Sequence, residues 1–321
     1  MVPESTPERM TTQPYHIPAL LTESIEALNI KPSGIYVDCT LGGGGHTRAI
    51  LAAISQVGGE GGRLLSFDQD TDAIGRALED LELSGNPHLQ LVHGNFRFLR
   101  NFLRYYGAEQ VDGILADLGV SFHHFDDPGR GFSFRFEGPL DMRMNRDSRR
   151  DAATLIAEAS EQQLADILHL YGELRQARRM AAAIVKARAQ QPVATVERLL
   201  EVVKPFINPR QEKKELAQLF QALRIAVNDE IEALRSLLVQ ARDALKPEGR
   251  LAIITYHSLE DRLVKNFLKT GNLEGREEKD FYGRPLSPFK LLNSKPIVTS
   301  AQEVEANPRS RSAKLRIAEK R

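Results

Sequence analysis

Four consecutive glycines, Gly42 to Gly45, constrain this chain more than any other feature. They follow a short run of β-branched and aromatic residues that starts after Gly34, and they precede a stretch with the pattern of a helix. Because glycine has no Cβ atom, the backbone here can turn sharply and lie flat against a ligand. A strand, a glycine loop and a helix in this order indicate the front edge of a nucleotide-type cofactor site, with a glycine-rich surface turn as the alternative.

Strand-like and helix-like segments alternate up to Asp117. After the first strand, the pattern predicts strands at Arg63–Asp68, Leu89–His93 and Val111–Asp117. It predicts helices between them, over residues 47–53, 72–83 and 98–106. Such alternation predicts an α/β fold with a parallel sheet, whose ligand site lies at the carboxyl ends of the strands.

Two cofactors fit this architecture, a nicotinamide dinucleotide and S-adenosylmethionine. Asp68 lies 23 positions after Gly45, near the spacing at which a dinucleotide fold binds the ribose hydroxyls through an acid. The first strand also ends in an acid, Asp38, which would repel a pyrophosphate but attract a sulfonium and an α-amino group. Asp117 and the turn after it fit methyltransferases that modify exocyclic amines. We therefore favour S-adenosylmethionine, with capping of loop amides as the alternative role of Asp38 and Asp117.

Size and composition indicate a soluble protein of two domains. The 321 residues exceed the roughly 100–200 that are usual for one domain. The formal net charge is zero, so any basic surface must be local. The single cysteine, Cys39, excludes an intramolecular disulfide, fits a cytoplasmic protein and is expected to be a small buried apolar residue. We expect no metal, because no metal-ligand spacing is present, and no membrane span, because no apolar run approaches about 18 residues.

The alternation stops after Asp117 and resumes near the C-terminus. A long loop is expected over residues 122–145, followed by helices over 152–157, 160–171, 173–190 and 196–203. Residues 212–244 are expected to be helical in two pieces, 246–249 to turn, and 250–256 and 314–318 to form strands. We infer a cofactor-binding sheet domain of residues 1–125 and 222–321, interrupted by a helical substrate-recognition insertion over 126–221.

Basic residues gather in and around this insertion. Cations mixed with aromatic rings suit an RNA backbone and splayed bases. On charge alone a solvated face is the simpler explanation, but the position of the insertion beside the ligand end of the sheet favours RNA. The cations are Arg175, Arg178, Arg179, Lys186 and Arg188 in one predicted helix, Arg130, Arg135, Arg143, Arg146, Arg149 and Arg150 in the loop before it, and Arg309, Arg311, Lys314 and Arg316 near the C-terminus.

The chain resembles the ribosomal RNA small subunit methyltransferase H (MraW) family over nearly its whole length, from Tyr15 to Ser312. The most specific motifs lie at residues 38–46, 117–121, 131–133, 138–144 and 257–262. The resemblance implies a class I, Rossmann-like S-adenosylmethionine-dependent methyltransferase sheet with an inserted all-helical domain. It also implies methylation of the N4 amine of a cytosine at the decoding (P-site) centre of 16S rRNA, with the assembled small ribosomal subunit as the partner.

The same resemblance suggests site residues. Gly44, Gly45 and His46 would contact the methionine end of the cofactor, Asp68 would bind the ribose, and Phe96 would pack near the adenine. Asp117 would lie at both the cofactor and the target amine, which makes it the candidate catalytic residue. The family usually has Gln where this chain has His124, which could still donate a hydrogen bond to the cofactor.

Tyr256 and His257 lie at the end of a central strand and are candidates for the base pocket, with a core or capping role as the alternative for His257. Three other classes of function remain open: a methyltransferase of small molecules or DNA, a nicotinamide oxidoreductase, and a non-catalytic RNA-binding or assembly protein. The sequence leaves the oligomeric state open, with a homodimer among the options.

Overall fold

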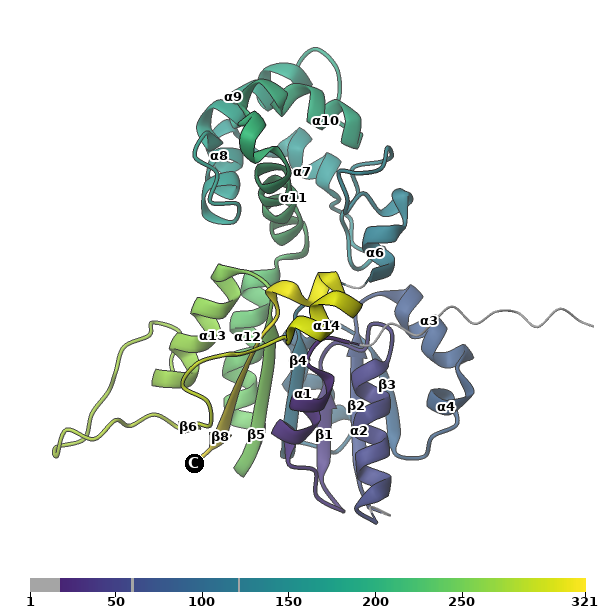
Figure 1. The fold of residues 1–321 in the computed structure, drawn as a ribbon, viewed down its shortest axis with the longest axis vertical. Coiled ribbons are helices and arrows are strands. Elements are labelled where there is room, and N and C mark those ends of the chain that lie inside the picture. The colour runs from purple at the N-terminus through teal and green to yellow at the C-terminus, as the bar shows by residue number, and fades with distance from the viewer. Residues whose placement is uncertain (1–17, 59–60, 121) are drawn as a thin grey trace, which may run out of the picture.

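The computed structural model describes residues 18–58, 61–120 and 122–321, so the Tyr15–Ile17 part of the N-terminal motif and Ser121 lie outside the described residues. One eight-stranded sheet forms the lower part of the molecule, and a group of helices stands above it (Figure 1). The strands are β1 (Ile35–Asp38), β2 (Arg63–Asp68), β3 (Leu89–His93), β4 (Val111–Asp117), β5 (Leu245–Thr255), β6 (Phe289–Leu291), β7 (Ile297–Val298) and β8 (Lys314–Lys320).

The sheet has the order β3-β2-β1-β4-β5-β8-β6, with β7 paired to β8. Strands β1 to β5 are parallel, and β8 runs antiparallel beside β5. The chain moves outward from β1 to β2 and β3, and β4 lies on the other side of β1. The carboxyl ends of β1 and β4 therefore meet at a topological switch point, where open α/β sheets bind their ligands. This confirms the predicted α/β Rossmann-like fold.

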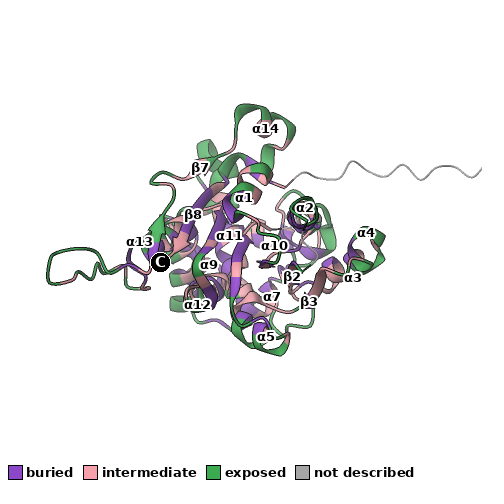
Figure 2. Cartoon of the chain, turned by 90° about the horizontal axis from the view of Figure 1, so that it is seen from below, coloured by how far each residue is buried: buried purple, intermediate pink, exposed green. Residues whose placement is uncertain are grey.

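Alternate residues of the central strands pack on opposite faces of the sheet. Val37, Leu65 and Ile114 belong to one core, and Tyr36 and Leu64 belong to the other. Helices α5 (Leu99–Tyr105), α12 (Glu230–Ala244) and α13 (Ser258–Thr270) cover the first face, whereas α1 (Leu21–Leu28), α2 (Gly45–Gln56), α3 (Thr71–Glu79) and α4 (Leu81–Ser84) contribute to the second. Seen from below, buried strands run between the outer helices (Figure 2). Cys39 is buried in the first core, as expected.

A third core lies in the helices that stand above the sheet. Its centre includes Leu140, Leu164, Leu168, Leu199 and Leu223, all 1% exposed or less. The helices of this part are α7 (Ala152–Glu158), α8 (Glu161–Leu170), α9 (Ala177–Arg188), α10 (Val196–Val203) and α11 (Glu212–Asn228). Together they form the helical part, whose chain lies between β4 and β5.

The helical part ends at Asp229, where α11 stops and α12 starts. Asp229 has a left-handed backbone, with φ 54°, and it is both the residue after α11 and the residue before α12. The residues that α11 contributes to the third core include Leu223, beyond residue 221, and helix α11 itself continues to Asn228. The predicted boundary at residue 221 thus falls inside a continuous helix.

Several local predictions were wrong for identifiable reasons. Helix 72–83 is divided at Asp80, whose carboxylate accepts from the amides of Glu82 and Leu83 and starts α4. Helix 173–190 begins only at Ala177, because Glu173 has a left-handed φ of 52°. The expected turn at 246–249 is a bulge within β5, where the register with β4 shifts.

The expected loop at 122–145 contains one short α-helix, α6 (Phe122–Asp126), and one 3₁₀ turn at Pro128–Arg130. The remaining elements near the C-terminus, β6, β7 and helix α14 (Ala301–Ala306), were not predicted, and neither was α1. They are short or carry few apolar residues in a regular period, which is the signal that sequence prediction relies on. Within the described ranges, no helix has the length and apolar character needed to cross a bilayer.

Because the sheet and the helical part have separate cores, a cavity in one core should destabilise that part more than the other. Replacing the fully buried Leu168 by Ala should lower the free energy of unfolding by about 2–5 kcal/mol, because it leaves a cavity in the helical core. Amide hydrogen exchange should accelerate in α8 and α9 and remain slow in β1 and β4.

The matched variant is Leu237→Ala, at a fully buried position of α12 in the sheet core. It should give the opposite pattern of exchange. Equal acceleration in both parts by both variants would mean that the two cores unfold as one unit.

Candidate active site

The glycine loop is built around the buried carboxylate of Asp38. Its Oδ1 accepts from the backbone amide of Thr40 at 3.0 Å, and its Oδ2 accepts from the hydroxyl of Thr47 at 2.7 Å. Asp38 therefore binds residues on both sides of the glycines, which is the capping role expected as one alternative. The hydroxyl of Thr47 also lies 2.6 Å from that of Ser66 on β2.

The loop itself presents bare backbone. Gly42 and Gly44 have left-handed φ values of 50° and 78°, and a Cβ added at Gly42 or Gly43 would have no heavy atom within 4 Å. Gly45 differs, because its Cβ would lie 2.7 Å from the ring of Pro18. The amides at the start of α2 receive no side-chain cap from Gly44. The loop thus leaves open space in front of a helix N-terminus, the arrangement expected where a ligand approaches the backbone.

Asp68 stands at the end of β2, facing this loop. Its Oδ2 accepts from the amide of Gly42 at 2.8 Å and its Oδ1 from the amide of Asp70 at 2.9 Å. Burial raises the pKa of Asp68 above its ordinary value, although these amides act in the other direction. Each oxygen retains a further lone pair, so the carboxylate can still accept from a hydroxyl.

Asp117 ends β4 beside the same loop. Its amide donates to the hydroxyl of Thr40 at 2.8 Å, and its Oδ1 accepts from the amide of Gly119 at 3.2 Å. Its Oδ2 lies 3.9 Å from Nδ1 of His46, whose buried Nε2 has no hydrogen-bond partner within the described protein. Burial raises the pKa of Asp117, whereas His46 and a hydrogen bond from Tyr256 oppose this rise. The structure thus brings the glycines, His46, Asp68 and Asp117 to one place.

Comparison with known proteins agrees with this arrangement. Residues 13–321 match the model of the MraW methylase family. The chain is 57% identical over 307 residues to the ribosomal RNA small subunit methyltransferase H of Bacteroides thetaiotaomicron, and the match covers 96% of this chain and 98% of the relative. The corresponding protein of Phocaeicola vulgatus is also 57% identical, with the same coverage.

The chain belongs to the MraW methylase family.

Among solved structures, an rRNA methylase from Streptococcus thermophilus covers 97% of this chain and 99% of its own, at 13% identity and a TM-score of 0.39. That value is too low to add to the assignment, which depends on the family and the close relatives. Family membership confirms the predicted resemblance and S-adenosylmethionine as the cofactor.

The described residues fit this cofactor. Asp38, Asp68 and Asp117 place negative charge around the open glycine loop, which favours a ligand with a sulfonium and an α-amino group. Asp68 has acceptor capacity for ribose hydroxyls, and the unpartnered Nε2 of His46 is a buried polar atom that a bound ligand could satisfy. Gly44 and Gly45 leave the helix amides uncovered. When bound, the cofactor supplies the electrophilic methyl group.

His124 lies next to this site but makes a protein contact that the sequence did not reveal. Its Nε2 is 2.5 Å from Oδ2 of Asp70, and its ring stacks on Phe132 with centroids 4.8 Å apart. Its Nδ1 is buried and has no hydrogen-bond partner in the part of the chain that the structure describes. The side chain is therefore held through Asp70, and only Nδ1 is left for a cofactor contact.

Arg130 completes this buried group. Its guanidinium contacts Oδ2 of Asp70 at 3.3 Å and Asp72 at 3.0 Å, and it donates to the carbonyls of Arg143 and Met144. The group, formed by Asp70, His124 and Arg130, ties the segment after β4 to the end of β2. Sequence reasoning missed Asp70, although an Asp directly before a predicted helix is a common cap.

Phe96 starts a 3₁₀ turn at Phe96–Phe98, after β3, and is half-buried. Its ring packs partly against the sheet core. Its side chain thus has a packing role, and its predicted contact with adenine stays a prediction.

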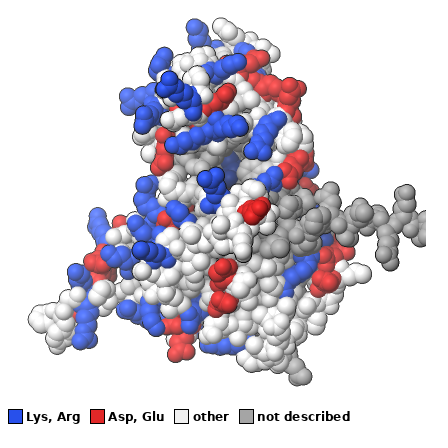
Figure 3. All heavy atoms as spheres, viewed as in Figure 1, with Lys and Arg blue, Asp and Glu red and all other residues white. Residues whose placement is uncertain are grey.

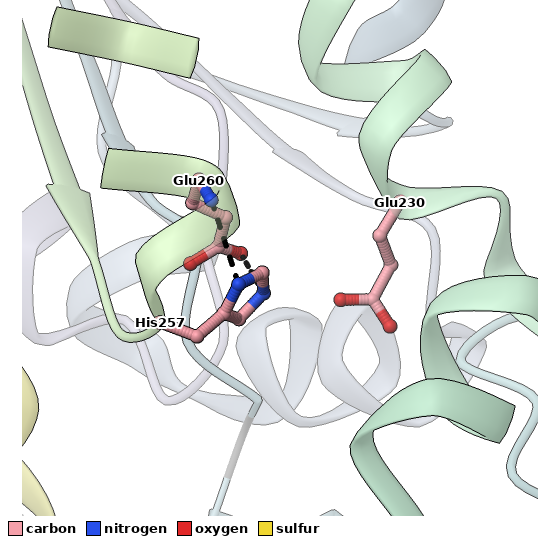
Figure 4. A group of neighbouring side chains, drawn as sticks. All are labelled: Glu230, His257 and Glu260. Atoms are coloured by element: carbon pink, nitrogen blue, oxygen red, sulfur yellow. Dashed lines mark hydrogen bonds and ion pairs between the residues drawn. The ribbon is translucent and has the colours of Figure 1, made fainter. Parts of the chain in front are cut away.

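Glu230, His257 and Glu260 form a compact group whose potential metal-ligand atoms lie within 4.8 Å of one another (Figure 4). Hydrogen bonds engage both carboxylates and Nδ1 of His257, whereas Nε2 of His257 is buried with no hydrogen-bond partner among the described residues. His257 caps α13 by accepting from the amide of Glu260 through Nδ1, which leaves the proton of a neutral ring on Nε2, 3.1 Å from Oε1 of Glu260. Arg224 binds both oxygens of Glu230, at 2.8 and 3.0 Å. His257 thus caps α13, which is the alternative role that the sequence left open for it.

The buried group at Asp70 gives a pH test of stability. Burial opposes ionisation, but the hydrogen bond and charge of His124 and the charge of Arg130 lower the pKa of Asp70 from 3.8 to about 2. A lowered carboxyl pKa contributes stability above the unfolded value, and this contribution is lost as the pH falls through about 4 toward 2. It amounts to roughly 2 kcal/mol.

The variant Asp70→Asn lacks this contribution. The difference in free energy of unfolding between the natural protein and the variant, measured with urea, should shrink by roughly 2 kcal/mol as the pH falls from 5 toward 2. Glu79→Gln, an exposed change on α3, should show no such trend. A difference that stays constant with pH would contradict the ion-pair interpretation.

Proposed function

We propose that this protein transfers the methyl group of S-adenosylmethionine to the N4 amine of a cytosine in the decoding region of 16S rRNA. The close relatives named as ribosomal RNA small subunit methyltransferase H support the substrate class. The proposed partner is the assembled small ribosomal subunit, and the single buried cysteine fits the cytoplasm, where that partner is found.

The observation that carries the proposal is the position of Asp117. It lies at the switch point of the sheet, beside the open glycine loop, and its side chain is 17% exposed. Oδ1 accepts from the amide of Gly119, whereas Oδ2 lies 3.9 Å from Nδ1 of His46, at the start of α2. An acceptor oxygen next to the cofactor site is what an amine substrate needs for alignment.

Cytosine N4 is a poor nucleophile, because its lone pair is delocalised into the ring. Holding it in line with the methyl group can supply on the order of 7–11 kcal/mol of the barrier. In our proposal Asp117 accepts a hydrogen bond from the amine, favours its pyramidal form and takes up the proton released after transfer. The raised pKa of the Asp117 carboxyl makes this proton easier to hold.

The charge of the helical part supports RNA as the substrate. Arg175, Arg178, Arg179 and Lys186 are exposed on α9 and the segment before it. Lys and Arg side chains gather on the helical part and on both sides of the hollow between it and the sheet (Figure 3). The hydroxyl of Ser258, two residues after Tyr256, lies 3.5 Å from Glu173, so the basic segment begins close to the carboxyl end of β5.

Some predicted RNA contacts are instead structural. Arg130 is buried on Asp70, and Arg188 donates to the carbonyls of Ile156 and Ala159. Arg143 binds Asp141, and Arg316 binds Asp261. The RNA surface that we propose is therefore smaller than the sequence suggested and centres on α9.

The other classes fit less well. Membership of a methylase family argues against two of the alternatives, a nicotinamide oxidoreductase and a non-catalytic RNA-binding or assembly protein. A small amine as the substrate would not need the exposed cations of α9, whereas DNA carries the same phosphate charge as RNA and is distinguished from it by a substrate assay.

The decisive experiment is transfer of labelled methyl from S-adenosylmethionine to small ribosomal subunits that lack the modification, followed by nucleoside analysis. N4-methylated cytidine in the rRNA is the expected product. Binding of the cofactor without transfer to subunits would overturn the proposed substrate and direct the search to free RNA, DNA or a small amine.

Asp117→Ala should lower kcat for this transfer by at least about 100-fold, because it removes the acceptor of the target amine. The dissociation constant of S-adenosylhomocysteine, measured calorimetrically, should rise much less. Asp243→Ala, on the outer part of α12, is the control and should leave both quantities unchanged. Equal losses of cofactor binding and turnover would defeat the role assigned to Asp117.

A further inference from the structure

Tyr256 lies beside the Asp117 carboxylate but does not belong to the glycine loop. It follows the last residue of β5, and β5 pairs with β4 so that Ile254 stands beside Asp117. A Cβ placed on Gly119 would be 2.8 Å from the Tyr256 ring and 3.3 Å from Oδ1 of Asp117. The ring and the carboxylate thus meet over Gly119, where only a residue without a side chain fits.

The ring of Tyr256 lies against the Asp117 carboxylate, and the interaction of its hydroxyl with that carboxylate lowers the pKa of Asp117 and raises that of Tyr256. Burial raises the pKa of Tyr256 well above 10.0, and the charge of Asp117 raises it further. The phenol therefore keeps its proton at neutral pH, and it must be the donor to the carboxylate.

The backbone of Tyr256 is fixed from the other side. Its amide donates to Oε2 of the buried Glu260 at 2.9 Å. Oε1 of Glu260 lies 3.1 Å from Nε2 of His257, and Glu230 faces this pair from the start of α12 (Figure 4). Arg224 of α11 binds Glu230, so a charged pair anchored on the last helix of the helical part lies beside the residues that hold Tyr256.

We propose that Tyr256 is a positioning residue, whose hydroxyl holds the Asp117 carboxylate in the rotamer that directs Oδ2 toward the target amine. The proposal deepens the proposed function and rests on it. The Gly119 amide binds Oδ1 and the Tyr256 ring lies beside this oxygen, whereas Oδ2 lies toward His46, directly after the glycine loop. A free carboxylate would sample other rotamers and present its oxygen to the amine only part of the time.

The charged and titratable groups that act on this pair come from several elements. They are Asp38 at the end of β1, His46 on α2, Glu260 on α13 and Glu303 on α14. Tyr256→Phe changes none of them, and it keeps the ring that packs against Gly119. The change therefore removes a single hydrogen bond to the ionised form of Asp117.

The test is Tyr256→Phe, measured by methyl transfer to small ribosomal subunits across the pH range. The kcat should fall by about 10- to 100-fold, as expected for one hydrogen bond to a charged group. KM for subunits and the affinity for S-adenosylhomocysteine should change by less than about threefold. Since the lost donor stabilised the carboxylate, the acid limb of the pH–rate profile should move to higher pH.

Tyr105→Phe is the matched control, because that ring is 80% exposed on α5. A Tyr256→Phe enzyme with unchanged kcat and an unchanged acid limb would overturn the positioning role. So would a parallel loss of kcat and cofactor affinity, which would indicate a general disturbance of the site.

A measurement that needs no substrate separates this proposal from the proposed function. The carboxyl carbon of Asp117, followed by NMR titration of the cofactor-bound enzyme, should titrate at higher pH in Tyr256→Phe than in the natural protein. Such a shift without methylation of ribosomal subunits by the natural protein would overturn only the substrate assignment. Methylation by the natural protein with no shift in the variant would overturn only the role of Tyr256.

Discussion

The site depends on one buried carboxylate, that of Asp38. Its two oxygens bind Thr40 and Thr47, which flank the four glycines, and Thr40 in turn accepts from the amide of Asp117. A loop of glycines has a large conformational entropy to lose, so it needs contacts that define its path. One fully buried side chain therefore orders the glycine loop and fixes its position relative to the end of β4. Asp68 and Asp117 in turn contact this loop, through the amide of Gly42 and the hydroxyl of Thr40.

Sequence reasoning recovered the elements with a strong period and the residues at strand ends. Strands β2, β3 and β4 match their predicted bounds, because apolar runs of this length between helices have few other interpretations. It also identified Asp68 and Asp117, since a residue at the carboxyl end of a parallel strand must lie at the ligand edge. These parts follow from local pattern and topology together.

The missing parts are contacts between distant segments. Nothing local distinguishes Arg130, buried on Asp70, from Arg178, which is exposed, because both stand in basic polar sequence. Nor could the pattern indicate that Tyr256 lies against Asp117, since that contact needs the register between β4 and β5. Charge composition therefore overestimated the RNA surface, and side-chain roles within the site became visible only in three dimensions.

The place of the helical part in the chain has a consequence for how such an enzyme can acquire a new target. The helices leave the sheet after β4 and return at Asp229, so both crossings are at the edge that holds Asp117. Their own core is separate from the two cores of the sheet. In the function that we propose, target recognition and methyl transfer belong to parts with separate cores, joined at the edge that holds Asp117. On that proposal, other helices inserted at the same place would bring another substrate to the same edge without a change in the sheet that supports it.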